Sequence, residues 1–360
     1  MKVLSVVGAR PQFIKAAPVG KALAAAGHAH FLVHTGQHYD PEMSARFFGE
    51  LGMEEPALDL GVGPTTTDEA RVERMRRLLE PVVSAEKPDW VLVFGDTNST
   101  LAGALGASAA GVALAHIEAG LRSFNAAMPE ERIRVQVDNV SSLLLCPSDR
   151  AAANLEAEGL TAGVHVVGDV MGDAISEVLR KEHSAPAARD FYFATVHRSE
   201  NTDDAGRLGA ILAAFDALDL PVRFPVHPRT RKAIERLGHL PARHVSFEEP
   251  AGYRETVLLE RGARAVLTDS GGVQKEAYWV GTPCVTLRDE TEWTETVGAG
   301  WNALAGADTA RILEAARSAR RPAERPPLYG DGRAAERCVA LLERGIAGGP
   351  EGIAALHKHG

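Results

Sequence analysis

The sequence predicts an α/β protein made of two doubly wound, Rossmann-like domains that face a central cleft. Across most of the 360 residues, short apolar segments alternate with helical patterns. The apolar segments are continuous, as is typical of strands in a parallel sheet that is covered on both faces. Two such series follow one another and meet near residue 168, which indicates two successive domains.

The first domain, 1–168, begins with the expected strand KVLSVVG and the expected helix PQFIKAAPVGKALAAAG. Pro11 suits the first turn of that helix, and Gly27 suits its C-terminal end. The further strands expected in this domain are AHFLVHT, DWVLVFGD, VALAHIEAG and SLLLCP.

The second domain, 169–330, follows VHVVGD and contains the expected strands DFYFATVH, VRFPVH, ARAVLTD and TPCVTL. Helical patterns separate these strands, as the crossover connections of a parallel sheet require. A last helix at 331–347 follows a turn at LYGDG. We assign this helix to the N-terminal domain.

The composition excludes several classes of partner. The net charge is −9, and acidic and basic residues are interleaved. Nucleic acid and anionic membranes both need a basic face, so neither is an expected partner. The N-terminal apolar run is too short for a signal peptide, and no apolar stretch approaches the length of a membrane span. We therefore expect a cytoplasmic protein.

Polar residues gather where the predicted strands end. They are Arg10, Gln37, His38, Asp96, Glu118, His197, His227, Asp269 and Ser270. In open α/β sheets, ligands bind beyond the carboxyl ends of the strands. With two such domains, the natural binding site is the cleft between them.

The stretch LTDSGGVQKEA at 267–277 predicts a site for a nucleoside diphosphate. Ser270 is placed to cap a helix whose free N–H groups favour phosphate, and Gly271 and Gly272 let an anion approach the backbone. Glu276, about one turn further, is placed to accept hydrogen bonds from a ribose diol. The alternative is a strand–helix turn in which glycine only supplies flexibility.

No cofactor or metal is expected. No G-x-G-x-x-G follows a predicted strand, and GVGPTT at 61–66 lacks the third glycine. Walker, H-E-x-x-H and G-x-S-x-G patterns are also missing from the sequence. The three cysteines match no zinc or redox spacing.

Four residues of the first domain are candidates for chemistry at the cleft. Arg10 and Lys15, in GARPQFIK, are placed to reach a phosphate, unless both are exposed surface cations. Asp96 follows a strand ahead of a helix, so it is either a catalytic acid or the cap of that helix. Glu118 directly follows the apolar segment VALAHI, where a carboxylate is unusual unless it has a buried polar task.

Further candidates come from two other segments. His197, in ATVHRSENTDD, is of the residue type that exchanges a proton near neutral pH, although a histidine at a strand end is often structural. The segment HIEAGLRSFNAAMPEERIR adds Arg122, Glu130 and Glu131.

Eight short motifs occur in one order along nearly the whole chain. They are GARPQFIK, TGQHYD, GDTNSTLAGA, HIEAGLRS, MPEE, VHRSEN, LTDSGGVQKEA and RDETE. Each motif is weak alone, but the ordered set closely resembles the non-hydrolysing UDP-N-acetylglucosamine 2-epimerases. The resemblance implies a glycosyltransferase-B-like fold, a homodimer, and interconversion of UDP-GlcNAc and UDP-ManNAc.

The resemblance also implies a mechanism and roles for residues. UDP is eliminated from C1 to leave a 2-acetamidoglucal, and is added back after C2 is reprotonated on its other face. The implied catalytic residues are Asp96, Glu118, Glu130 and His197. The implied substrate-binding residues are Arg10, Lys15, Arg122, His227, Ser270, Gly271, Gly272 and Glu276. Gln37, His38 and Arg198 resemble positions where many members bind a second UDP-GlcNAc as an activator.

The sequence departs from the family pattern at several positions. Ile133 stands where many members have Asn, Asn139 where His is frequent, and Trp293 where some members have Arg. GARPQ replaces the commoner GTRPE. The forms GARPQFIK and DETEW resemble a branch that includes epimerases for modified sugars such as UDP-diacetamido-glucuronate, so the choice of substrate stays open.

Three other functions fit the same site. A glycosyltransferase would use the UDP site but leave three acids with little to do. A variant that admits water would release free ManNAc and UDP. A sugar-nucleotide sensor would bind without turnover, and Ile133 would then mark the loss of catalysis.

Overall fold

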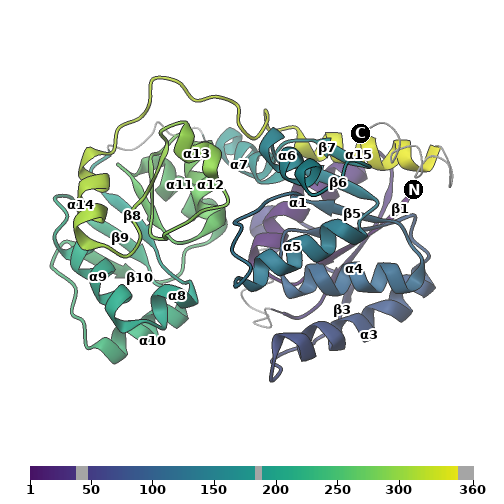
Figure 1. Ribbon diagram of the computed structural model, residues 1–360, viewed down its shortest axis with the longest axis horizontal. Coiled ribbons are helices and arrows are strands. Elements are labelled where there is room, and N and C mark those ends of the chain that lie inside the picture. The colour runs from purple at the N-terminus through teal and green to yellow at the C-terminus, as the bar shows by residue number, and fades with distance from the viewer. Residues whose placement is uncertain (38–47, 183–188, 348–360) are drawn as a thin grey trace. The chain divides into compact units, whose positions relative to one another are not determined.

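The computed structural model describes residues 1–37, 48–182 and 189–347. The chain divides into two compact units (Figure 1). The N-terminal unit comprises Met1–Ser176 and the chain from Tyr329 onward, and the C-terminal unit comprises Glu177–Leu328.

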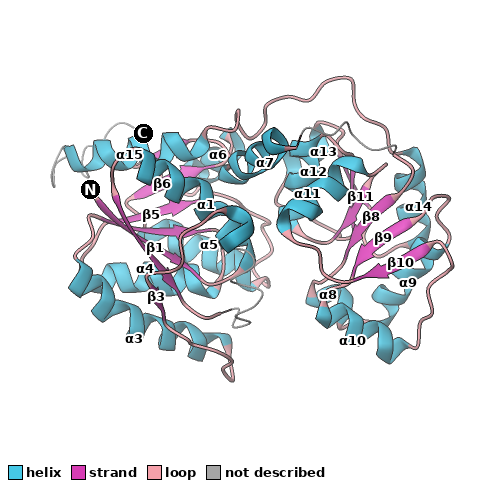
Figure 2. Cartoon of the chain, turned by 180° about the vertical axis from the view of Figure 1, so that it is seen from behind, coloured by secondary structure: helices cyan, strands magenta, loops and turns pink. Residues whose placement is uncertain are grey.

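The N-terminal unit is built on a parallel sheet with the strand order β3-β2-β1-β4-β5-β6-β7 (Figure 2). β1 pairs with β2 on one side and with β4 on the other, so the winding of the chain reverses between β1 and β4. The strands are β1 (Lys2–Val7), β2 (Ala29–His34), β3 (Leu58–Asp59), β4 (Trp90–Phe94), β5 (Leu114–Ile117), β6 (Leu143–Cys146) and β7 (Val164–Val166).

Helices cover both faces of this sheet. α3 packs on α4 and α4 on α5 over one face, while α1 packs against α15 over the other (Figure 1). The helices are α1 (Arg10–Ala25), α3 (Asp68–Glu86), α4 (Asn98–Ala110), α5 (Pro129–Val140), α6 (Asp149–Ala157), α7 (Val170–Lys181, which crosses into the C-terminal unit) and α15 (Ala334–Ala347).

The C-terminal unit repeats the plan with the strand order β10-β9-β8-β11-β12-β13. Its winding reverses between β8 and β11. The elements are β8 (Tyr192–Thr195), α8 (Ser199–Thr202), α9 (Ala205–Asp216), β9 (Val222–Pro225), α10 (Pro228–Leu237), β10 (Val245–Glu248), α11 (Tyr253–Gly262), β11 (Val266–Thr268), α12 (Gly271–Val280), β12 (Cys284–Thr286), α13 (Thr294–Gly298), β13 (Asn302–Leu304) and α14 (Thr309–Ser318).

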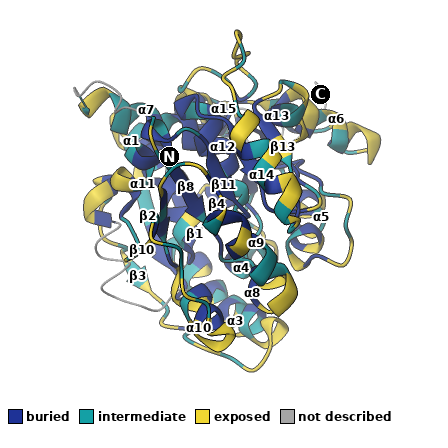
Figure 3. Ribbon diagram, turned by 90° about the vertical axis from the view of Figure 1, so that its left-hand side faces the viewer, coloured by how far each residue is buried: buried dark blue, intermediate teal, exposed yellow. Residues whose placement is uncertain are grey.

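The predicted α/β class with two parallel sheets is confirmed, and burial explains why the sequence indicated it. Every residue of β4 is buried, because helices cover both sides of the strand, and Figure 3 shows strands in dark blue beneath helices with exposed yellow faces. The edge strands β3, β10 and β13 were not predicted. They pair on one side only, and each contains polar or incompletely buried residues, so none forms a continuous apolar run.

Among the described helices, none combines the length and the apolar character needed to cross a bilayer.

The C-terminal helix α15 is fastened to the N-terminal unit by polar contacts. The Trp90 indole donates to the Leu342 carbonyl at 3.1 Å, and His28 Nε2 lies 2.7 Å from a carboxylate oxygen of Glu343. At the start of the helix, the backbone N–H of Ala334 donates to the carboxylate of Asp173 on α7 at 3.0 Å. Asp173 therefore caps α15 from a distant part of the sequence.

The Asp173 cap has a consequence for stability against pH. Burial raises the pKa of Asp173 to about 6, and the nearby Asp169 adds to the rise, while the N–H groups of Ala334 and Ala335 oppose it. Because this pKa is higher in the folded than in the unfolded chain, the folded state binds more protons, so stability falls as pH rises from about 4 to about 6.

We therefore compare the free energy of unfolding of Asp173→Asn with that of the native chain at two pH values. The difference, variant minus native, should be higher at about pH 7 than at about pH 4.5, by about 1–3 kcal/mol before solvent screening. Urea unfolding at both pH values measures this. Asp331→Asn is the control, because the ion pair with Arg337 lowers the pKa of exposed Asp331 and places its titration below this window. An equal difference at both pH values for Asp173→Asn would contradict the prediction.

Candidate active site

A buried ion pair lies at the carboxyl edge of the N-terminal sheet. Lys15 Nζ of α1 lies 2.5 Å from Glu118 Oε1, and each side chain is only 7% exposed. Glu118 follows β5, while α1 follows β1, and β4 separates these two strands. The prediction that Glu118 has a buried polar task is confirmed, and Lys15 is not a surface cation.

The backbone around this pair is specialised. Glu118 has a left-handed backbone with φ of 73°, a conformation that costs a non-glycine residue about 1–3 kcal/mol and often marks functional sites. At the end of β4, a Cβ on Gly95 would lie 2.9 Å from Lys15 Nζ and 3.3 Å from Glu118 Oε1. Glycine at this position therefore lets the ion pair approach the strand end.

Asp96, the next residue, pairs with Arg134 of α5. It is not the cap of α4, because Thr97 is the N-cap and its side chain accepts from the Thr100 N–H. The alternative interpretation of Asp96 as a helix cap is therefore wrong. Its carboxylate is directed to a cation at the edge where the strands end.

Glu131 is a sequence candidate without an assigned role, and in the structure it organises the loop after Glu118. Its carboxylate accepts from the N–H and the hydroxyl of Ser123 at 2.9 and 3.0 Å, and from the Phe124 N–H at 3.0 Å. It also pairs with Arg134 at 3.0 Å. The signal was present in the sequence as acid and arginine three residues apart in PEERIR, facing one side of a helix.

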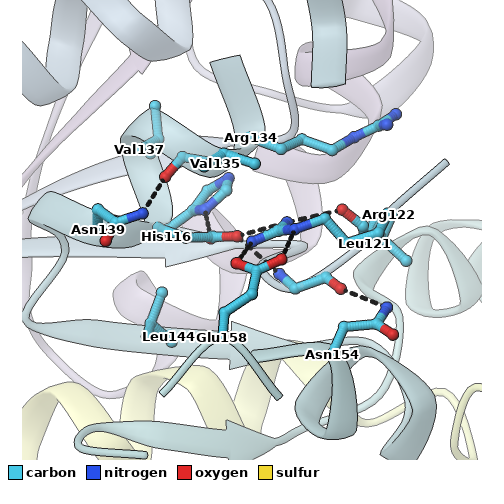
Figure 4. A network of polar contacts seen from close by, with 12 residues as sticks. His116, Leu121, Arg122, Arg134, Val135, Val137, Asn139, Leu144, Asn154 and Glu158 are labelled. Atoms are coloured by element: carbon cyan, nitrogen blue, oxygen red, sulfur yellow. Dashed lines mark hydrogen bonds and ion pairs between the residues drawn. The ribbon is translucent and has the colours of Figure 1, made fainter. Parts of the chain in front are cut away.

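A buried polar network adjoins the same edge of the sheet (Figure 4). Arg122 contacts Asp138 at 2.8 Å and Glu158 at 2.7 Å. Asp138 lies 2.7 Å from Nδ1 of His116, whose Nε2 lies 2.8 Å from the Gly95 carbonyl. The network thus runs from Arg122 to the backbone of Gly95, which lies next to Lys15 and Glu118. That Arg122 binds substrate stays a prediction.

The Asp138 carboxylate is the centre of that network. Burial by itself would raise the pKa of Asp138, but the hydrogen bond and charge of His116, together with Arg122, outweigh burial and lower the pKa. Asp138 therefore stays ionised and accepts from the Gly120 N–H at 3.2 Å as well. This acceptor fixes the turn that follows Glu118.

The other predicted residues of the N-terminal unit lie around this edge. Arg10 begins α1 and Glu130 lies in the first turn of α5, both half-buried. Gln37 follows β2, and its side-chain oxygen accepts from the N–H and hydroxyl of Ser99 at 3.1 and 2.6 Å. His38 lies outside the described residues.

In the C-terminal unit, Asp269 occupies the matching place at the end of β11. Its buried carboxylate accepts from the backbone N–H groups of His197 and Arg198, both at 3.0 Å, and from the Asn201 side chain at 3.1 Å. It therefore joins the turn after β8 to the start of α12. His197 lies next to His227, the N-cap of α10, with ring centroids 6.0 Å apart.

Ser270 caps α12, as predicted, with its hydroxyl accepting from the Val273 N–H at 3.4 Å. Gly271 and Gly272 form the first turn of the helix, and Glu276 lies on the next turn and is buried. A Cβ on Gly271 would lie 2.5 Å from Glu292 Oε1. Glycine is thus favoured here by close packing against Glu292 as well as suited to phosphate, and that it binds phosphate stays a prediction.

Glu292 belongs to a buried charged cluster behind this turn. It pairs with Arg288 at 2.9 Å, and both side chains are at most 3% exposed. Lys275 Nζ lies 4.2 Å from the centre of the Trp293 ring. Trp293 thus stabilises a buried cation, whereas an Arg at this position would place a second positive charge beside Lys275.

Two other departures from the family pattern also have a structural reason. Ile133 is 7% exposed and packs in the core with α3 and α4. Asn139 is exposed, and its side chain donates to the Val135 carbonyl at 2.8 Å (Figure 4). Neither makes a described contact with Lys15, Asp96 or Glu118, so neither indicates decay of the site.

Among the described residues, no group of three or more His, Cys, Asp or Glu side chains is arranged to hold a metal ion. The two sheet edges present paired carboxylates, cations, histidines and helix N–H groups, which are groups that move protons and stabilise charge.

A family model described as UDP-N-acetylglucosamine 2-epimerase matches residues 21–343. The chain belongs to the UDP-N-acetylglucosamine 2-epimerase family. The resemblance inferred from the motifs is thereby confirmed.

Several members of the family are similar along nearly their whole length. A UDP-2,3-diacetamido-2,3-dideoxy-D-glucuronate 2-epimerase of Pseudomonas aeruginosa is 46% identical over 356 residues, which cover 96% of this chain and 100% of that protein. A UDP-N-acetylglucosamine 2-epimerase homolog of Methanococcus maripaludis is 44% identical over 330 residues, covering 87% of this chain and 91% of that protein.

A solved epimerase of the family has the same fold. The crystal structure of the Methanocaldococcus jannaschii UDP-GlcNAc 2-epimerase, in complex with UDP-GlcNAc and UDP, matches with a TM-score of 0.88 at 37% identity, covering 95% of this chain and 99% of that chain. The predicted glycosyltransferase-B-like fold class is confirmed.

We expect Glu131→Gln to destabilise this epimerase-family chain by about 2 kcal/mol or more, because the amide NH₂ would face N–H and O–H donors. We also expect turnover to fall at least about tenfold, since Arg134 would lose its ion pair with Glu131 and hold Asp96 less firmly. Urea unfolding and steady-state kinetics measure both effects.

The control is Glu73→Gln, because Glu73 pairs with two arginines on the half-exposed face of α3, where such pairs contribute little. Equal stability losses in Glu131→Gln and Glu73→Gln would show that the loop does not depend on Glu131.

Proposed function

We propose that this protein is a non-hydrolysing 2-epimerase of a UDP-linked 2-acetamido sugar, with UDP-GlcNAc and UDP-ManNAc as the interconverted pair. The observation that carries the proposal is the set of carboxylates at one sheet edge, Glu118 paired with Lys15 and Asp96 paired with Arg134, in a chain of this family. A glycosyltransferase would leave most of these acids with little to do.

The proposed reaction proceeds by elimination and re-addition. A carboxylate removes the proton from C2 while the bond between C1 and the diphosphate oxygen breaks, so that the electron pair leaves with UDP and a C1–C2 double bond forms. A proton is then delivered to the opposite face of C2, and UDP adds back to C1. Asp96, Glu118 and Glu130 are the proposed acids and bases, with His197 assisting at the diphosphate.

Cations and helix N–H groups stabilise the charge that develops on the departing UDP. In the N-terminal unit these are Arg10 and Lys15. In the C-terminal unit they are the N–H groups in the first turn of α12, which follows Ser270. The buried Glu276 is the proposed partner of the ribose hydroxyls.

The 46% identity to the UDP-diacetamido-glucuronate 2-epimerase of Pseudomonas aeruginosa supports a second candidate substrate, a UDP-2,3-diacetamido-glucuronate. Both substrates carry UDP and a 2-acetamido group, so the same elimination applies. A homodimer, a cytoplasmic location and a second UDP-GlcNAc bound as activator near Gln37, His38 and Arg198 stay predictions.

Incubation with each UDP-sugar in deuterated water tests the proposal. Epimerisation puts one deuterium at C2 of the UDP-linked product, which nuclear magnetic resonance and mass spectrometry detect. Transfer to an acceptor leaves C2 unlabelled, hydrolysis labels free sugar instead, and a sensor gives no turnover. Any of these three results would refute the proposal. The rates of epimerisation of the two UDP-sugars show which of them is the preferred substrate.

We expect Asp96→Asn and Glu118→Gln each to lower turnover by at least ~100-fold, the usual scale for a lost general acid or base. Unfolding curves accompany the kinetics, because Glu118→Gln also breaks the buried pair with Lys15. The control Glu158→Gln removes an acid that contacts Arg122 and is one-third exposed. Native rates in folded Asp96→Asn and Glu118→Gln would refute the assigned roles.

A further inference from the structure

A cavity of about 500 Å³ opens in the C-terminal unit at the edge of the sheet opposite to Ser270 and His197. Its lining segments immediately precede strands: Arg189 precedes β8, Trp279–Gly281 precede β12, and Trp301 precedes β13. Because all strands of this sheet are parallel, the cavity lies at their amino ends. It is therefore separate from the candidate active site of this unit.

The polar groups that line the cavity are donors. Four arginines contribute to it, Arg189, Arg261, Arg321 and Arg325, and none of the described lining residues is acidic. Trp279 also lines it, and the Nε1 of its indole is buried with no hydrogen-bond partner among the described residues. The chain has a net charge of −9, so a cavity lined by four arginines differs from the charge of the protein as a whole.

Local structure accounts for part of this charge. Arg325 donates to the carbonyls of Tyr278 and Trp279 at 3.3 and 2.8 Å, which end α12. Arg261 lies in the last turn of α11, where a cation is favoured by the helix dipole. Arg321 lies in neither helix, and for Arg189 burial and the charge of Arg264 lower the pKa. Among the described residues that line the cavity, no acid balances these four guanidinium groups.

The cavity walls are fixed by specific contacts. The Trp301 indole donates to the Glu324 carbonyl at 2.9 Å, and its ring meets the Tyr278 ring edge-on at 5.8 Å. The Tyr278 hydroxyl donates to the Pro326 carbonyl. The segment that carries Arg321 and Arg325 is thus held against the C-terminal unit, so the cavity is formed before any ligand arrives.

We propose that this cavity binds a small phosphorylated anion and that a diphosphate is the group recognised. Guanidinium groups bind phosphate oxygens through paired N–H bonds, and a cavity of this size falls in the range that accepts small organic ligands. An inorganic diphosphate and a nucleoside diphosphate share this group. Trp279 and Trp301 would add contact area only for the latter, through its base.

Titration calorimetry with inorganic diphosphate and, separately, with ADP tests the proposal. We expect Arg261→Gln/Arg321→Gln to weaken diphosphate binding at least about tenfold, since two guanidinium groups that donate charge-assisted hydrogen bonds to phosphate oxygens are lost. Arg321 is exposed, so Arg321→Gln alone serves if the double variant unfolds. Turnover without added diphosphate should stay within about twofold, because neither arginine lies at the candidate active site.

Two controls separate this site from others. Arg236→Gln/Arg243→Gln removes the same charge from exposed positions of the same unit, one of them also in the last turn of a helix, and should leave binding unchanged. Arg10→Gln should weaken only diphosphate bound at the candidate active site.

The proposal is overturned if the native chain does not bind diphosphate, if Arg261→Gln/Arg321→Gln binds it as well as the native chain, or if Arg10→Gln abolishes all binding. If ADP binds more tightly than inorganic diphosphate, the site is confirmed as one for nucleotides. Equal affinities confirm a site for the diphosphate group alone.

Discussion

The buried pair of Lys15 and Glu118 is the interaction on which the N-terminal edge depends. Two charges removed from water are tolerated only when each has close partners, and here they lie 2.5 Å apart. The pair requires glycine at 95, a left-handed backbone at Glu118, and strands β1 and β5 on either side of β4. The local backbone conformation and the order of the strands therefore both position the ion pair of Lys15 and Glu118.

The two units hold the turns after their strands in a similar way. Each places polar groups where the winding of its sheet reverses, and each holds them with a buried aspartate that accepts backbone N–H groups. Asp138 fixes the turn after β5, and Asp269 joins the turn after β8 to α12. Because these aspartates are fully buried and bonded, the residues around them keep their positions before substrate binds.

The residues that differ from the common family pattern make packing contacts or hydrogen bonds of their own. Ile133 enters the core, and Trp293 covers the buried Lys275. Gln12, in GARPQ, accepts the N–H groups of Gly8 and Ala9 and donates to the Phe94 carbonyl; a glutamate would accept the first two but lack the last donor. These residues are accommodated without a described contact to Lys15, Asp96 or Glu118, and the chain still matches the family model over residues 21–343.

The sequence by itself determined the two parallel sheets, the cap at Ser270 and the family, because continuous apolar runs and ordered motifs are local signals. Only the tertiary structure decided that Asp96 pairs with Arg134 and does not cap α4, that Glu131 holds the loop after Glu118, and that Asp173 caps a helix from far along the chain. The short edge strands belong to this second group. All of these depend on partners distant in sequence, and no local pattern of residues specifies which distant side chains will meet.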